Sequence, residues 1–391
     1  MNGAGVSGGS ERAGRIPLVD LLVSHAEVAA EVDAGFARVL GSGAFVRGPD
    51  VVAFEREFAA FSGTGHCVGV ANGTDALELM LRADEMPPGA RVVMPANTFV
   101  ATAEAVVRAG GTPAFADVDD EFLLLDPASA ERAVSAPGAW ALLPVHLNGQ
   151  LAPMEALADL AARTGVRIYE DAAQCQGATR NGRGAGAWSR AAGTSFYPGK
   201  NLGAYGDAGA VITDDRELAG LVREIADHGS SRKYVHDRFG VNSRLDTLQA
   251  VVLRAKLRRL ADWNAARRTA AARYDGLLAD LAADGLVRLP RTAPGNEHVW
   301  HIYAVRVPNR DAVLVDLNAS GIGAGVHYPV PVHLQPAFRE LGYARGDFPV
   351  AERAAQEILT LPLFPQITEE QQARVADALA KALANARKEA P

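Results

Sequence analysis

The sequence predicts an α/β protein, with a large domain built on a mainly parallel seven-stranded sheet sandwiched by helices and a smaller C-terminal α+β domain. Two observations predict this class. Short apolar runs alternate with helical stretches over the first half of the chain, which is typical of a parallel sheet covered on both faces. A long helical stretch, Leu245 to Tyr274, then precedes a region with fewer strands. We therefore place the large domain at 1–244 and the small domain at 245–391, and expect the glycine- and serine-rich residues 1–15 to be flexible.

The expected elements of the large domain follow in order. Residues 17–61 have helical periodicity, and the turn sequence GSGAFVRGPD separates two helices within them. Strands and helices alternate after that point. The seven candidate strands are HCVGV at His66, RVVM at Arg91, TPAF at Thr112, ALLPV at Ala141, VRIY at Val166, TSF at Thr194 and GAVI at Gly209.

The C-terminal part combines both types of element. The long helical stretch has leucine and valine on its apolar faces and many arginines on the opposite, solvated face. We expect it to link the two domains. The elements predicted after it are strands LVRLP at Leu286 and HIYAVRV at His301, a helix ending at Gly321, and two further helices at 352–361 and 369–383.

Composition limits the possible functions. Hydrophobic residues make up 48% and charged residues 22% of the chain, as in folded globular proteins. The net charge of −7 and the lack of a long basic run argue against nucleic-acid binding. Cys67 and Cys175 show no metal-ligand spacing, so we expect no metal site and a reduced, cytoplasmic location. No apolar run approaches the ~18 residues of a membrane helix, and the N-terminal segment lacks the apolar core of a signal peptide.

The segment GTSFYPGKNLGAYGDAG, residues 193–209, holds a lysine in a stretch too rich in glycine for regular helix or strand. An amine condenses reversibly with a carbonyl, and burial or a neighbouring cation can lower its pKa until the neutral form is accessible. Lys200 is therefore a candidate covalent nucleophile. The alternative is an ordinary solvated loop lysine.

Polar residues follow the predicted strands at the carboxyl ends, where such sheets hold ligands. His146 follows one strand and Asp171 ends another. An aspartate within reach of a pyridine nitrogen keeps that nitrogen protonated, whereas the alternative is a cap for a helix beginning at DAAQ. Gln174 is expected one helical turn further on, on the side of Asp171, where its amide can donate to a phenolic oxygen.

A helix start that suits a phosphate follows the first predicted strand. In the string NGTDAL, Gly73 and Thr74 open a helix with Thr74 or Asp75 near its cap. Free amides and the helix dipole favour an anion there, although an ordinary capped helix is the alternative. Ser195, five residues before Lys200, can add a hydroxyl from a neighbouring strand.

These groups together match the requirements of pyridoxal phosphate. That cofactor needs an imine partner, a carboxylate at its ring nitrogen and an anion cradle. Lys200, Asp171 and the NGTDAL helix start supply these three features. Phe99 lies just past the second predicted strand, where its ring can either stack on a flat cofactor or belong to the core.

Longer strings resemble the DegT/DnrJ/EryC1/StrS family of sugar aminotransferases, which are fold-type I pyridoxal-phosphate enzymes with an aspartate aminotransferase-like fold. The matching strings occur in the expected order over nearly the whole chain, so their combination is more specific than any single string. They are NGTDAL at Asn72, PANTFVATAEAV at Pro95, EDAAQ at Glu170, SFYPGKNLGAYGDAG at Ser195, GVNSRLDTLQA at Gly240 and HYPVPVHLQPAF at His327.

The resemblance implies catalytic roles for Lys200 and Asp171 and a homodimer with shared active sites. Asn242, in the NSR string, is implied to reach the cofactor phosphate of the neighbouring subunit. Relatives that deoxygenate sugars carry histidine in place of the lysine, so the lysine favours transamination. The implied cofactor-binding residues are Gly73, Thr74, Phe99, Asp171, Gln174, Ser195, Lys200 and Asn242.

The resemblance also implies a substrate class. The expected reaction moves an amino group from L-glutamate to a keto group of a nucleotide-linked deoxysugar, with dTDP as the expected nucleotide, in amino-deoxysugar biosynthesis. The string at His327 resembles members that aminate the 3-keto position, and His327 and Tyr328 are expected to line the sugar pocket unless the prolines there only fix a strand end. The charged loop 228–240 either holds the diphosphate or is solvated. A 4-keto sugar, an aminocyclitol, or a non-catalytic regulatory role are the alternatives.

Overall fold

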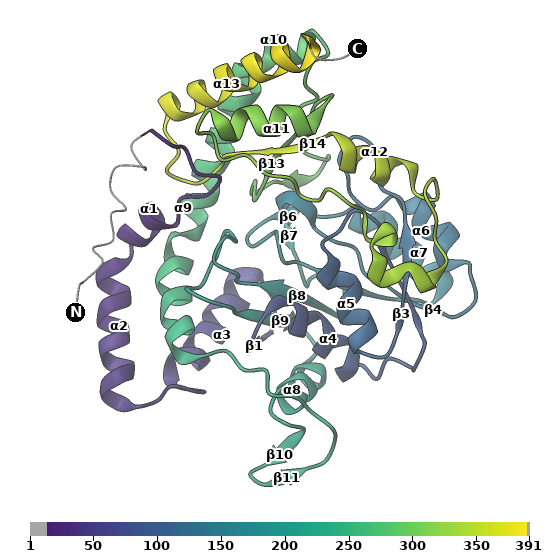
Figure 1. Cartoon of the computed structure of the whole chain (residues 1–391). Coiled ribbons are helices and arrows are strands. Elements are labelled where there is room, and N and C mark those ends of the chain that lie inside the picture. Colours follow the sequence, from purple (N-terminus) through teal and green to yellow (C-terminus); the bar gives the residue numbers. More distant parts are fainter. Residues whose placement is uncertain (1–13, 389–391) are drawn as a thin grey trace, which may run out of the picture.

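The structure is a computed structural model that describes residues 14–388 (Figure 1). Most of the N-terminal stretch expected to be flexible therefore lies outside the described residues. Helices surround a central sheet, and the C-terminal elements gather at one side of it. Within 14–388, none of the helices combines the length and apolar character needed to cross a bilayer.

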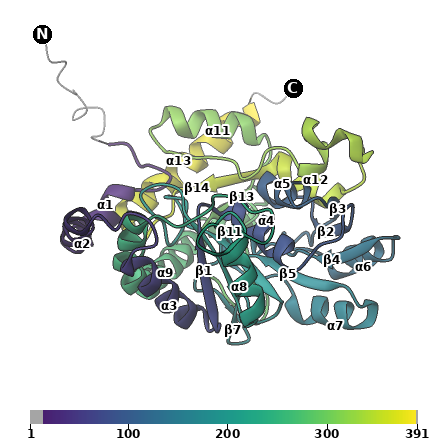
Figure 2. The ribbon, with the colours of Figure 1, turned by 90° about the horizontal axis from the view of Figure 1, so that it is seen from below.

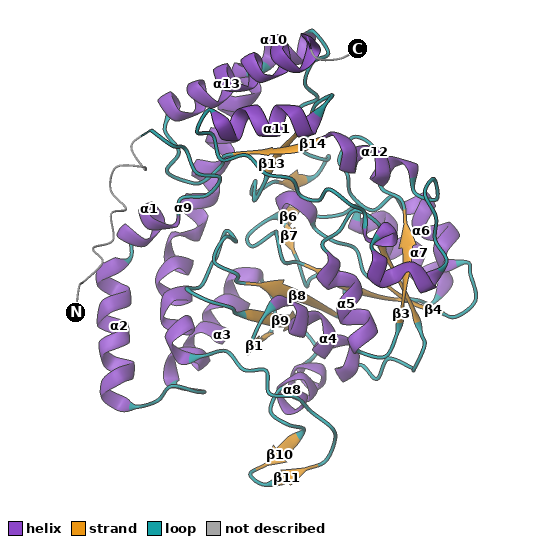
Figure 3. Cartoon of the chain, viewed as in Figure 1, coloured by secondary structure: helices purple, strands orange, loops and turns teal. Residues whose placement is uncertain are grey.

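The central sheet contains the seven predicted strands (Figure 3). They are β1 (His66–Val70), β2 (Arg91–Pro95), β3 (Thr112–Ala116), β4 (Ala139–Leu142), β5 (Arg167–Asp171), β8 (Ala191–Ser195) and β9 (Gly209–Thr213). Their spatial order is β1-β9-β8-β5-β4-β2-β3. Strand β9 is antiparallel to both of its neighbours, while β8, β5, β4, β2 and β3 pair in parallel. The predicted mainly parallel sheet is confirmed.

Helices cover both faces of the sheet, and the strand sequences show why. In β2, the side chains of Val92 and Met94 join one apolar cluster and that of Val93 joins another, because successive side chains of a strand point to opposite faces. Figure 2 shows α5 on one side of β4 and β5 and α7 on the other. The first face carries α4 (Gly73–Ala83), α5 (Val100–Arg108) and α8 (Arg216–Ile225), and the second α3 (Pro49–Ser62), α6 (Pro127–Val134), α7 (Met154–Thr164) and part of α9 (Thr247–Leu277).

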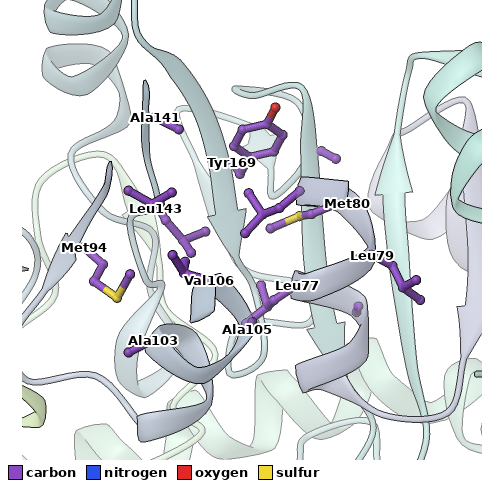
Figure 4. Close-up of a cluster of buried hydrophobic side chains, with 14 of the residues drawn as sticks. Leu77, Leu79, Met80, Met94, Ala103, Ala105, Val106, Ala141, Leu143 and Tyr169 are labelled. Atoms are coloured by element: carbon purple, nitrogen blue, oxygen red, sulfur yellow. The ribbon is translucent and has the colours of Figure 1, made fainter. Parts of the chain in front are cut away.

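The packing of α4 and α5 fixes the position of their first residues. Leu77 and Met80 of α4 and Val106 of α5 belong to one buried cluster with Tyr169 of β5 (Figure 4). Full burial of a leucine or methionine side chain stabilises the fold by about 1.5–3 kcal/mol. The N-terminal ends of both helices are thereby held at the carboxyl ends of the strands.

The C-terminal elements form a second layer with its own core. Strand β13 (Tyr303–Arg306) pairs antiparallel with β14 (Ile358–Leu361). Helices α11 (Arg310–Ala319) and α13 (Glu369–Lys388) pack with this pair and with the end of α9 in one apolar cluster. Around them lie α10 (Ala279–Ala283) and α12 (Pro349–Glu357).

Two predictions for this part were wrong. The run at Leu286 forms a single bridge, between Arg288 and Arg306, and no strand. The helix predicted over 352–361 ends at Glu357, and the four residues after it form β14. Ile358–Leu361 is fully buried and pairs with β13, so partners distant in sequence decide its conformation.

The N-terminal region runs along the outside of the molecule. Helices α1 (Leu21–Ala26) and α2 (Ala29–Ser42) precede α3, and α2 packs on α9. Ile16 donates its amide to Gly321 O and accepts from Gly323 N, and its side chain joins the C-terminal cluster. This segment therefore contacts the region predicted as the small domain, and the domain boundaries stay a prediction.

Short pairs of strands complete the structure. Strands β6 (Thr179–Arg180) and β7 (Arg183–Gly184) form a hairpin that also pairs with β12 (Asn296–Glu297). Strands β10 (Ser230–Arg232) and β11 (Val235–His236) form a hairpin that projects from the body of the molecule in Figure 1.

Candidate active site

A cavity of about 520 Å³ lies at the carboxyl ends of the strands, between the sheet and the C-terminal layer. Residues from both layers line it, which explains how segments far apart in sequence meet. It brings together nearly all the residues that the sequence predicted for a site, namely Gly73, Thr74, Phe99, Asp171, Gln174, Ser195, Lys200, His327 and Tyr328.

Asp171 is the last residue of β5 and is held from both sides. Its Oδ2 accepts a hydrogen bond from Thr102 Oγ1 at 2.7 Å, and its Oδ1 accepts one from the amide of Ala173 at 3.1 Å. No helix begins here, so the alternative of a helix cap is wrong. Burial raises the pKa of Asp171, while Thr102, Ala173 and the charge of Lys200 act in the opposite direction. A cation at this carboxylate, such as a protonated pyridine, would offset the cost of burial.

Lys200 lies in a turn, with its amide bonded to Tyr197 O at 2.8 Å. Its side chain lines the cavity and is only partly exposed, which contradicts the alternative of a solvated loop lysine. Burial lowers the pKa of Lys200 from 10.5 to about 8, although Asp171 favours the charged form. At pH 7 roughly a tenth of the molecules would therefore carry a neutral amine at this position.

The start of α4 offers two free amides. The helix is capped by Asn72, whose Oδ1 accepts from Asp75 N at 2.8 Å, so Thr74 and Asp75 lie in the first turn, near the cap as predicted. Within residues 14–388, the amides of Gly73 and Thr74 have no hydrogen-bond acceptor. A Cβ atom on Gly73 would lie 2.6 Å from Cβ of Ser195, so only glycine permits this close approach. The helix start and the Ser195 hydroxyl can hold an anion.

Gln174 connects two sides of the cavity. Its Oε1 accepts from Asn148 N at 2.7 Å, and its Nε2 donates to Tyr328 Oη at 3.2 Å. It follows Asp171 in a turn and not in a helix as predicted, but it still lines the same cavity. The Phe99 ring is 50% exposed and lies 5.2 Å from that of Tyr328, so it is not a core residue. His327 Nδ1 bonds Thr360 Oγ1 at 2.9 Å.

Other predicted residues lie outside the cavity. Asn242 is exposed and does not line it. His146 is fully buried, where its Nδ1 accepts from Ala152 N and its Nε2 bonds Glu170 at 2.6 Å. The charged loop 228–240 forms the projecting hairpin. A role of Asn242 or of this loop toward a second subunit stays a prediction.

Thr102 and His301 belong to the site but were not predicted from the sequence. Thr102 is fully buried and bonds both Asp171 and Thr98 Oγ1, each at 2.7 Å. The spacing of Thr98 and Thr102, four residues apart at a helix start, was a usable signal. His301 also lines the cavity, and the strand predicted over its segment gave no indication of this.

The family model described as the DegT/DnrJ/EryC1/StrS aminotransferase family matches residues 27–380. The dTDP-3-amino-3,4,6-trideoxy-α-D-glucose transaminase of Streptomyces venezuelae is 47% identical over 365 residues, which are 93% of this chain and 95% of that protein. The crystal structure of S. venezuelae DesV in complex with a ketimine intermediate has a TM-score of 0.90 at 46% identity, covering 94% of this chain and 98% of that one. The structure of NtdA from Bacillus subtilis with bound cofactor PMP has a TM-score of 0.88 at 31% identity, covering 95% and 86%. These neighbours confirm the predicted fold class.

Proposed function

Since the chain belongs to the DegT/DnrJ/EryC1/StrS aminotransferase family, we propose that it transfers an amino group from L-glutamate to the C3 keto group of a dTDP-linked deoxysugar. Family membership makes the protein a pyridoxal-phosphate-dependent aminotransferase, so the predicted enzyme class and cofactor are confirmed. The name of the S. venezuelae relative supports the dTDP-sugar and the C3 position. The observation that carries the proposal is the single cavity in which Lys200, Asp171 and two free helix amides meet.

The residues of this cavity fit the cofactor. Pyridoxal phosphate supplies an aldehyde and an electron-accepting ring. We propose that Lys200 is the covalent attachment point and that Asp171 accepts a hydrogen bond from the ring nitrogen. The amides of Gly73 and Thr74 and the hydroxyl of Ser195 would hold the phosphate, because all three are hydrogen-bond donors that line the cavity.

The remaining predicted residues have roles that suit their positions. Phe99 presents a half-exposed ring to the cavity, where it can stack on the cofactor. The Gln174 amide, held by Asn148, can turn a donor toward the phenolic oxygen. Tyr328 contacts the Phe99 ring and accepts a hydrogen bond from Gln174, and both His327 and Tyr328 are proposed to line the sugar site.

Lys200 Nζ is also the proposed proton carrier. A base must take a proton from one substrate carbon and return it to another position, and the base works best when its pKa lies near the working pH. Burial brings the pKa of Lys200 to about 8, so its neutral form is accessible near neutral pH. Asp171 is engaged by hydrogen bonds from Thr102 and Ala173, so we assign this transfer to Lys200.

We also infer a homodimer with Asn242 acting between subunits. Asn242 is exposed and outside the cavity of its own chain, which leaves its amide free to reach a second copy. Replacement by alanine is then expected to weaken cofactor retention in the dimer.

The test is an aminotransfer assay with purified holoenzyme and L-glutamate. The acceptors are dTDP-3-keto-4,6-dideoxy-α-D-glucose, dTDP-4-keto-6-deoxy-α-D-glucose and a keto-inositol, with products identified by mass spectrometry and NMR. We expect amination at C3 of the first acceptor. Amination of the 4-keto sugar or the keto-inositol instead would disprove the proposed substrate. The Lys200→Ala variant is the control for the cofactor: it should lose the visible absorbance of bound cofactor, and retention of that band would disprove the attachment site.

A further inference from the structure

His301 lines the cavity that contains Lys200, yet it has no role in the chemistry proposed above. It lies in the short segment between β12 and β13, which packs on Gly149, and its side chain is partly exposed. A polar side chain at this place can form hydrogen bonds with the protein or with the substrate. The hydrogen bonds of its two ring nitrogens distinguish these possibilities.

A chain of amides fixes the proton on the His301 ring. Asn264 Nδ2 donates to the backbone oxygen of Gln176 at 2.9 Å, so Asn264 Oδ1 faces Asn201. Asn201 Nδ2 then donates to Asn264 Oδ1 at 3.0 Å and to Val299 O at 2.9 Å. The oxygen of Asn201 therefore faces His301, at 3.2 Å from Nδ1. Because a carbonyl oxygen only accepts, Nδ1 carries the hydrogen and Nε2 of the neutral ring is an acceptor.

The surroundings keep this ring neutral. Burial lowers the pKa of His301 well below its usual value, and the positive charges of Lys200 and Arg267 act in the same direction. A ring with so low a pKa is a poor base at neutral pH. Nε2 thus offers a lone pair to a hydrogen-bond donor and does not carry protons through the reaction.

The segment that presents the ring is held by several contacts. Trp300 has φ of 47°, which is a rare conformation for a bulky residue. Arg267 Nη1 donates to Trp300 O at 3.2 Å, and Val299 N donates to Gly149 O at 2.9 Å. A Cβ atom on Gly149 would lie 2.8 Å from His301 N, so the two backbones are in close contact. Strain that is held by so many contacts is a feature of functional sites.

Three other acceptors of the cavity already hold hydrogen bonds from the protein. The carboxylate of Asp171 and the amide oxygens of Gln174 and Asn72 each accept hydrogen bonds from main-chain or side-chain donors. Nε2 of His301 has no partner within residues 14–388. We propose that His301 Nε2 accepts a hydrogen bond from a ring hydroxyl of the sugar substrate, which makes His301 a substrate-binding residue. This inference rests on the proposed sugar substrate.

The experiment measures ligand binding without turnover. Holoenzyme in the pyridoxamine phosphate form is titrated calorimetrically with dTDP-α-D-glucose and with dTDP alone. The variant is His301→Leu, which has no acceptor. The matched control is His66→Leu, because His66 is a partly exposed histidine of β1 that does not line the cavity and has no side-chain hydrogen bond within residues 14–388. A buried hydroxyl without its acceptor loses enough free energy to weaken binding about tenfold to hundredfold.

We expect H301L to weaken the binding of dTDP-α-D-glucose by that factor and to leave the binding of dTDP and the cofactor absorbance unchanged, while H66L changes the binding of neither ligand. Equal affinity for dTDP-α-D-glucose in H301L and wild type, or an equal loss of affinity in H66L, would overturn the proposal. If H301L does not fold, monodeoxy analogues of dTDP-α-D-glucose are titrated against wild type. One of these analogues should bind more weakly than dTDP-α-D-glucose by the same factor. A series in which no analogue loses more than about threefold in affinity overturns the proposal.

Titrations with UDP-α-D-glucose and α-D-glucose 6-phosphate separate this inference from the proposed function. If wild type binds one of these and not dTDP-α-D-glucose, the proposed nucleotide is wrong and His301 is judged by the effect of H301L on that ligand. If wild type binds none of the three hexoses, both proposals fall.

Discussion

Replacement of Lys200 by methionine should stabilise the cofactor-free protein. Methionine keeps the length of the side chain but removes the charge that burial disfavours. The pKa of Lys200 falls from 10.5 to about 8, and each pKa unit corresponds to about 1.4 kcal/mol. The folded state therefore loses up to about 3 kcal/mol by holding this ammonium at neutral pH. This is an upper limit, because the side chain is partly exposed and keeps some hydration.

The sign of the pH dependence follows from the lowered pKa. Below pH 8 both the folded and the unfolded chain carry the ammonium, so the full cost is present. Between about pH 8 and 10.5 the folded chain releases its proton first, and the wild-type protein gains stability relative to the variant. Urea unfolding of the two apo proteins should show K200M more stable by up to about 3 kcal/mol at pH 7, and this pH-dependent advantage should fall below about 1 kcal/mol at pH 10.

The matched control is Lys233→Met, since Lys233 is an exposed lysine of the projecting hairpin. Its replacement should change the free energy of unfolding by less than about 0.5 kcal/mol at either pH. A K200M protein that is less stable than wild type at pH 7, or an advantage that does not change between pH 7 and 10, would refute the reasoning that burial of Lys200 lowers its pKa.

Two further predictions concern the neighbours of Lys200. Thr102→Val removes the donor to Asp171 Oδ2, so it should raise the pKa of Asp171 further. Urea unfolding at pH 7 should show a free energy of unfolding lower by about 1–3 kcal/mol. Thr102→Ser keeps the hydroxyl and should not lower it, and equal losses in both variants would indicate a packing effect instead. Gly209→Ala places a Cβ 2.4 Å from the carbonyl of Asn72, so it should cost about 1–3 kcal/mol in thermal unfolding and weaken cofactor retention measured by absorbance. Gly220→Ala in α8, with open space around it, should gain about 0.5–1 kcal/mol, and similar behaviour of both glycine variants would contradict the proposed close approach.

The sequence predicted the sheet because its strands are marked locally. Val92 and Val93 lie on opposite faces of β2, and both faces are covered, so the run is apolar throughout. The polar residues that end such runs, among them Asp171, necessarily meet at one edge of a parallel sheet. Most of the cavity lining could therefore be predicted from the order of strands and the resemblance to a known family.

Features set by distant partners could not be predicted in this way. Ile358–Leu361 follows a helix without a break in the apolar pattern, and pairing with β13 turns it into a strand. Gln174 was expected on a helix, but the chain turns after Asp171, and Gln174 bonds Tyr328 from the C-terminal layer. In both cases the local pattern allowed two conformations, and a contact across the fold selected one.

The same limit applies more strongly to protonation states. Lys200 and His301 are both recognisable as titratable from their side chains, yet burial makes one a more accessible amine and the other a neutral acceptor. The tautomer of His301 depends on Asn201, which lies 100 residues away in sequence, and the pKa of Asp171 depends on Thr102, 69 residues away. Because these contacts join segments that are distant in the sequence, the chemistry of the site is a property of the assembled fold. Variants that loosen the contact between the layers should therefore alter reactivity even where they touch no residue of the cavity.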